Sequence, residues 1–131
     1  MALVFVNGGE DLALKALLNH TAGQNLVLRL YRNDQTPVDT HTSSDYTEAN
    51  FTGYAAVTLT GSSWSVSGGV SSYAQQSFTS SAGSQNQDVY GYYMTQTSSG
   101  LLVYAERFTN GPYNIADNGD VIRVTPQILA D

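Results

Sequence analysis

Side chains that could act as a catalytic base or a metal ligand are few and far apart in this chain. The two histidines are His20, expected at a helix end, and His41, within a Ser/Thr-rich loop, and there is no cysteine. Neither histidine lies in a nucleophile signature of the kind that serine hydrolases use. Zinc requires three or four His, Cys or carboxylate ligands, which two distant histidines do not supply. We therefore predict no catalytic residues, no metal and no cofactor, with both histidines in contact with solvent.

The densest group of acidic oxygens is the segment Asp117-Asn118-Gly119-Asp120. Calcium loops place their ligands at alternating positions and end with a late glutamate, and this segment has neither feature. Asn-Gly between two strand-forming runs is a strong signal for a tight hairpin turn. The segment is therefore predicted to form a turn rather than a metal loop.

Glu106 is the acid expected in or near a β-sheet, because it follows a run of strand-forming residues. Glycoside hydrolysis needs a second carboxylate that faces the first across a cleft, and the sequence shows no such partner. We predict instead that Glu106 forms a cross-strand ion pair with Arg29 or Arg123. A catalytic acid in a small hydrolase is the alternative.

The composition limits the classes of partner. The 131 residues carry 5 basic and 11 acidic side chains, a formal net charge of −6, and Lys15 is the only lysine. Nucleic acids and anionic membranes are bound by clustered Lys and Arg, so neither is an expected partner. Charged residues make up 12% of the chain, against about 25% in typical domains. The first residues lack the basic and continuous apolar regions of a secretory signal, and no apolar run is long enough to span a membrane.

One convincing helix is predicted over residues 8–19. Asn7 as N-cap and Glu10 three residues later form a capping-box pattern. Leu14, Leu17 and Leu18 share one face of this helix. The preferred interpretation is a helix that covers one end or side of a sheet, with Gly23 closing it. The alternative is an amphipathic helix that binds a partner.

The segment around which the fold is expected to form is a hairpin of residues 89–96 and 101–108. A short polar loop that ends in Gly100 joins its two strands. Both faces of the hairpin are largely apolar, as expected for the middle of a sandwich or for an interface. Tyr90, Tyr92 and Met94 share one face, and Tyr31 is expected on the outer face of strand 26–31. These four residues are the candidate interface, with core or edge packing as the alternative.

Further strands are predicted on both sides of this hairpin. They cover residues 26–31, 46–51, 54–60, 73–79, 113–116 and 121–125, with Trp64 as a core anchor and 127–131 as an edge or a free end. Short strands at this spacing are typical of an all-β sandwich or small barrel. We predict one domain over residues 1–131, with an N-terminal arm or strand (1–6), the helix (8–19) and about eight strands within 26–125.

Several runs resemble segments of small β-rich proteins encoded among the structural genes of tailed bacteriophages. The runs are Asn33-Asp34-Gln35-Thr36-Pro37, Phe51-Thr52-Gly53-Tyr54-Ala55, Tyr73-Ala74-Gln75-Gln76-Ser77-Phe78, Val89-Tyr90-Gly91-Tyr92, Ala105-Glu106-Arg107-Phe108, Gly111-Pro112-Tyr113 and Asn118-Gly119-Asp120. They span most of the chain, and they are patterns of fold rather than of catalysis. No individual binding residue is implied by them.

The resemblance implies a β-sandwich of jelly-roll type and a structural role without enzymatic activity. The expected protein is a capsid decoration (cement) protein that stabilises the shell by binding between major capsid subunits. Its partners would be the major capsid protein and copies of itself in a homotrimer. It would be made in the host cytoplasm and end on the capsid surface of the virion. The alternative is a glycan-binding module of a tail or baseplate that uses the face of Tyr90 and Tyr92.

Overall fold

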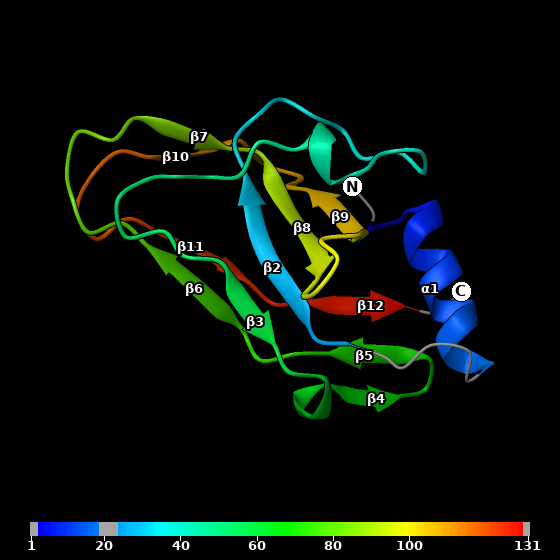
Figure 1. Cartoon of the computed structure of the whole chain (residues 1–131). Helices are drawn as coiled ribbons and strands as arrows, with labels where there is room; N and C mark the ends of the chain where they lie inside the picture. The colour runs from blue at the N-terminus through cyan, green and yellow to red at the C-terminus, as the bar shows by residue number, and fades with distance from the viewer. Residues whose placement is uncertain (1–2, 19–23, 130–131) are drawn as a thin grey trace.

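The protein is described by a computed structural model that covers residues 3–18 and 24–129. Within these residues it is mostly β, with one α-helix and twelve strands in antiparallel sheets (Figure 1). The elements are β1 (Val4–Phe5), α1 (Asn7–Leu17), β2 (Leu26–Tyr31), β3 (Val57–Leu59), β4 (Ser65–Ser67), β5 (Val70–Ser72), β6 (Gln76–Thr79), β7 (Gln87–Val89), β8 (Gly91–Gln96), β9 (Leu102–Arg107), β10 (Tyr113–Ile115), β11 (Val121–Val124) and β12 (Gln127–Leu129). Two 3-10 turns, Ser43–Asp45 and Gly61–Ser63, complete them.

The largest sheet has five strands in the order β1-β9-β8-β2-β3. Strand β2 covers the predicted residues, and the predicted central hairpin forms as β8 and β9. β8 lies in the middle of the sheet, and all six of its residues are buried. A register shift between Met94 and Thr95 places a bulge in the β8–β9 ladder. The hairpin is therefore covered on both faces, as its apolar pattern predicts.

From Val70 to Leu129 the chain forms one long antiparallel ribbon that turns between β8 and β9. Strands β5, β6, β7 and β8 pair in turn with β12, β11, β10 and β9. Backbone hydrogen bonds continue the pairing between these strands: Tyr73 N–H to Pro126 O, Gly119 N–H to Ser80 O, Gln85 N–H to Ala116 O, and Phe108 N–H to Tyr90 O. In Figure 1 the ribbon runs from β5 and β12 through β6 and β11, then β7 and β10, to β8 and β9 in the centre.

Interruptions of this ribbon explain why the described residues contain more strands than the predicted eight. Pro126 has no backbone N–H to donate, and the ladder is split there into β11 and β12. Residues 80–86 form an irregular connection between β6 and β7. Predicted strand 73–79 is accordingly reduced to Gln76–Thr79, and the expected edge strand at the C-terminal end is β12. Strand 26–31 forms over its full predicted length, whereas the ribbon is interrupted between β7 and β8 and between β11 and β12.

The main hydrophobic core lies between one face of the five-stranded sheet and the rest of the ribbon. The sheet contributes Leu28 and Leu30 from β2 and Tyr92 and Met94 from β8. The opposite side contributes Phe78, Ile115, Ile122 and Val124. Leu59 of β3, Val89 of β7, and Ala49 and Phe51 of the segment between β2 and β3 complete the core. Trp64 is half-buried against this core and contacts the ring of Tyr73, as expected of an anchor.

A second, smaller core covers the other face of the sheet. Its centre is a cluster of three tyrosines, Tyr31, Tyr46 and Tyr93, with the rings of Tyr46 and Tyr93 stacked at 5.2 Å between centroids. Tyr31 was expected to face outward, and it is instead fully buried because the segment that carries Tyr46 folds over it. That segment is not the predicted strand 46–51, since it pairs with the sheet only through a bridge between Tyr31 and Glu48.

Helix α1 forms near its predicted place, but its capping and its apolar face differ from the prediction. Val6 is the N-cap, no side chain caps the first turn, and Asn7 is already helical. Gly8 and Gly9 lie against β9, where a Cβ at Gly9 would collide with the carbonyl oxygen of Val103. The helix therefore packs through its glycines. Asn19, His20 and Gly23, with the side chain of Leu17, lie outside what the structure describes.

Candidate functional site

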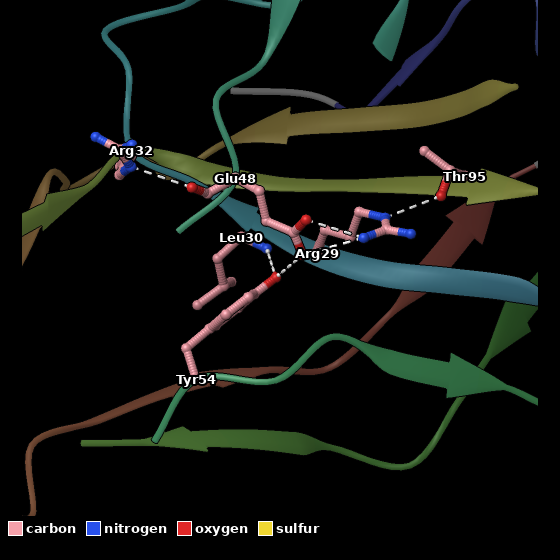
Figure 2. Close-up of polar contacts among 6 residues, drawn as sticks. All are labelled: Arg29, Leu30, Arg32, Glu48, Tyr54 and Thr95. Carbon is pink, nitrogen blue, oxygen red and sulfur yellow. Dashed lines mark hydrogen bonds and ion pairs between the residues drawn. The ribbon is translucent and has the colours of Figure 1, made fainter. Parts of the chain in front are cut away.

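A cluster of polar side chains is centred on the carboxylate of Glu48 (Figure 2). Arg29 Nη1 donates to both carboxylate oxygens of Glu48, at 2.9 and 3.1 Å. The hydroxyl of Tyr54 donates to Oε2 of Glu48 at 2.6 Å and accepts the backbone N–H of Leu30 at 3.2 Å. Arg29 Nε also donates to the hydroxyl of Thr95 at 3.1 Å.

This cluster connects segments that are distant in sequence. Arg29 and Thr95 belong to the neighbouring strands β2 and β8. Glu48 and Tyr54 lie on either side of residues 49–53, which contribute Ala49 and Phe51 to the main core. Arg32 Nε adds a bond to the backbone carbonyl of Glu48 at 3.1 Å. Burial, followed by the hydrogen bond to Glu48, raises the pKa of Tyr54 above its ordinary value. These hydrogen bonds connect β2, β8 and the segment of residues 48–54, which is the geometry of a structural cross-link.

We expect Glu48→Ala to destabilise the protein by about 2 kcal/mol, because it leaves Arg29 and the Tyr54 hydroxyl without their shared acceptor. Denaturant unfolding measures the loss. The matched control is Asp34→Ala, which removes the 2.6 Å ion pair between Arg107 and Asp34. Asp34 is largely exposed, so that change should cost less than about 1 kcal/mol. Equal losses in the two variants would contradict a structural role for the Glu48 cluster.

The four residues of the predicted interface have different environments. Tyr31, Tyr92 and Met94 are buried by other parts of the chain, which is the packing alternative of the prediction. Tyr90 is half-buried, and the guanidinium of Arg107 lies 5.2 Å from its ring centroid. Three of the four are therefore covered by the chain itself and are not available to a partner in this fold. Tyr92 and Met94 pack in the main core, whereas Tyr31 lies in the second core with Tyr90 packed against it. The predicted shared face of Tyr90, Tyr92 and Met94 is therefore wrong, because Tyr90 lies between β7 and β8 and the strand alternation is interrupted there.

Glu106 pairs differently from the prediction. Its Oε1 accepts the hydroxyl of Tyr92, directly opposite on β8, at 2.8 Å. Arg29, one of its predicted ion-pair partners, instead binds Glu48. Burial and the nearby Glu106 carboxylate raise the pKa of Tyr92 above its ordinary value. Tyr92 therefore remains a neutral donor, and the pair is a cross-strand hydrogen bond.

His41 is half-buried rather than fully solvated. Its Nδ1 lies 2.9 Å from the hydroxyl of Tyr46, and the two rings meet edge to face. Burial raises the pKa of Tyr46 to about 12, so its hydroxyl is neutral at physiological pH. His20, the second candidate base, lies outside the described residues.

The predicted turn at Asp117–Asp120 is confirmed. Asp120 Oδ2 accepts the backbone N–H groups of Ala116 and Asp117, at 2.9 and 2.8 Å. These two bonds lower the pKa of the Asp120 carboxyl. Within residues 3–18 and 24–129, no group of three or more His, Asp or Glu side chains is arranged to hold a metal ion. The acidic oxygens of this segment thus stabilise the turn itself.

Helix α1 presents large apolar side chains to solvent. Leu14 and Leu18, predicted to pack on the sheet, are 56% and 74% exposed. The correction follows from the packing of α1 through Gly8 and Gly9, which turns the following apolar positions toward solvent. This pattern is the one expected of the alternative interpretation, an amphipathic helix that binds a partner. We name Leu14 and Leu18 the α1 apolar face.

Sequence reasoning did not find Glu48 or Tyr54, because no local pattern connects residues that meet only after folding. In the described part of the chain, no helix combines the length and apolar character required to cross a bilayer. The chain matches no family model, no curated protein and no solved structure.

Proposed function

We propose that this protein is a virion structural component, a capsid decoration protein that stabilises a phage shell by adhesion and without turnover. The observation that carries the proposal is the α1 apolar face, which presents two leucines to solvent. Burying a leucine side chain in an interface contributes about 1.5–3 kcal/mol, so two of them supply a useful part of a stable contact. The resemblance of the sequence runs to phage structural proteins gives the class of partner.

The ribbon supports the finer part of the proposal, a fold of jelly-roll type. A jelly roll is a double sheet of antiparallel strands with long connections between its layers. Here one continuous ribbon supplies both the central hairpin β8–β9 and the strand pairs on the far side of the main core. Such a fold provides a rigid support from which α1 can reach a neighbouring subunit. The proposed partners are the major capsid protein and two further copies of this chain.

Binding to shells tests this proposal. We expect the double variant Leu14→Ser/Leu18→Ser to lose at least about 100-fold in affinity for purified shells that lack the protein, as measured by co-sedimentation. Shells carrying the wild-type protein should withstand heat or osmotic shock better than bare shells. The matched control is Val66→Ser, because Val66 on β4 is also 74% exposed but lies on another element.

Circular dichroism and the unfolding midpoint establish that each variant is folded before it is mixed with shells. Light scattering of the free protein tests the homotrimer. Failure of wild-type protein to bind shells, or unchanged shell stability on binding, would overturn the decoration role. Binding that the double variant retains in full would overturn the assignment of the α1 apolar face.

A further inference from the structure

A groove of about 500 Å³ lies where three distant segments meet. Its walls come from the start of α1, the loop of residues 39–43, and the turn between β8 and β9. Leu101 and Leu102 give it an apolar side, and the residues of the loop give it a polar one. This groove is distinct from the α1 apolar face, which lies further along the helix.

Hydrogen bonds hold the walls of the groove in place. The backbone N–H of Asn7 donates to the carbonyl of Asp39 at 3.1 Å, which connects the helix to the loop. The backbone N–H of His41 donates to the carbonyl of Val38 at 3.1 Å. Thr42 and Asp45 form a reciprocal capping box at the end of the loop. The groove is therefore preformed, as small-molecule sites usually are.

His41 is oriented by a contact outside the groove. Its Nδ1 is engaged by the hydroxyl of Tyr46, whose ring is buried and stacked on Tyr93. The other ring nitrogen, Nε2, is then the one left for a ligand. When the Tyr46 hydroxyl donates to Nδ1, the neutral imidazole carries its proton on Nε2 and donates from there.

The loop also offers polar groups that the described residues do not use. Within residues 3–18 and 24–129, the carboxylate of Asp39 and the hydroxyl of Thr40 have no hydrogen-bond partner, although both side chains line the groove. Asp39 can only accept while ionised, and Thr40 can donate and accept. Donors and acceptors thus stand opposite an apolar wall that contains Leu101.

We propose that this groove binds a neutral saccharide. A sugar ring carries hydroxyls that both donate and accept, and its C–H face packs on apolar side chains, so it matches both walls. The carboxylate of Asp39 and the net charge of −6 disfavour phosphorylated or otherwise anionic ligands. The proposal does not depend on the decoration role, since it uses different residues.

The test is an NMR titration of the whole protein with neutral hexoses and disaccharides, to about 10 mM because single-sugar sites are weak. We expect shift changes centred on residues 39–43 and 99–102 for at least one sugar. Asp39→Asn and Thr40→Ala should each weaken its binding about tenfold. The matched controls, Asp117→Asn and Thr58→Ala, change exposed side chains on other segments and should leave the affinity unchanged.

A second arm uses a neutral cell-surface polysaccharide that contains the same sugar. If the wild-type protein binds both the free sugar and the polysaccharide, and the Asp39→Asn protein binds neither, the groove is assigned to a surface glycan. If only the free sugar binds, the groove is assigned to a soluble saccharide. The proposal is overturned if no sugar shifts the groove residues, or if the Asp39 and Thr40 variants bind as tightly as their controls. Neither outcome bears on shell binding, which the α1 variants test separately.

Discussion

Gly91→Ala will destabilise the protein by about 3 kcal/mol or more, a large share of the stability of a domain of this size. Gly91 begins β8 in the middle of the five-stranded sheet. A Cβ at this position would collide with the carbonyl oxygen of Glu106 and would lie 2.5 Å from the hydroxyl of Tyr31. The first is backbone of the neighbouring strand β9, and the second belongs to a fully buried ring, so neither can move away cheaply.

Urea unfolding of the variant and of a matched control measures this effect. Gly83→Ala is the control, because a Cβ at Gly83 meets nothing within 4 Å. We expect the control to remain within about 0.5 kcal/mol of the wild type. A Gly91→Ala protein as stable as the control would mean that Tyr31 does not pack against the start of β8, and the described second core would be incorrect.

Alkaline pH will unfold the protein cooperatively near pH 11. Six tyrosines have pKa values raised above the ordinary 10.0, in each case chiefly by burial: Tyr31, Tyr46, Tyr54, Tyr92, Tyr93 and Tyr104. For Tyr46 and Tyr93 the pKa rises to about 12. Their rings form much of the packing on the two faces of the central sheet.

The sign of this effect follows from the raised pKa values. Below pH 10 the tyrosines are neutral in both the folded and the unfolded protein, and their contribution to the free energy of unfolding is fully present. Above pH 10 the unfolded chain loses these protons while the folded protein keeps them, so stability falls until the pH passes the folded pKa values. At pH 11 each tyrosine that stays protonated in the folded protein costs about 1.4 kcal/mol, and the six together cost more than about 5 kcal/mol, which approaches the whole stability of a small domain.

Chemical denaturation measured from pH 8 to pH 11 tests this prediction, with tyrosinate absorbance as an independent reading of ionisation. Tyr93→Phe should reduce the slope of stability against pH above pH 10 by about a sixth, because its hydroxyl is one of the six with a raised pKa. Tyr113→Phe is the control, since Tyr113 is 42% exposed, and it should leave the slope unchanged. Gradual ionisation of all tyrosines without cooperative unfolding would contradict the buried positions described here.

Strands and turns with a strong local pattern were predictable from the sequence. The alternation of Leu28 and Leu30 in strand 26–31, and Asn118-Gly119 between two strand-forming runs, determine their structure through neighbours a few residues away. The coarse class, a mostly β domain with one helix near its start, follows from such local signals. So does the buried central hairpin, because both of its faces are apolar.

The tertiary structure alone decided which faces are covered and by what. Tyr31 follows an outward alternation and is nevertheless buried, because the segment that carries Tyr46 folds across it. Leu14 and Leu18 follow a helical apolar pattern and are nevertheless exposed, because α1 packs through its glycines.

The polar groups show the same division between local and distant contacts. Arg29 and Glu48 form an ion pair, and Asp39 and Leu101 line the same groove. Neither pair is related by a helical or strand spacing, so its members come together only when the fold brings distant segments into contact. Local sequence determines backbone conformation through short-range sterics and hydrogen bonding. Burial and the grouping of side chains instead depend on contacts between residues far apart along the chain, and no short sequence window contains that information.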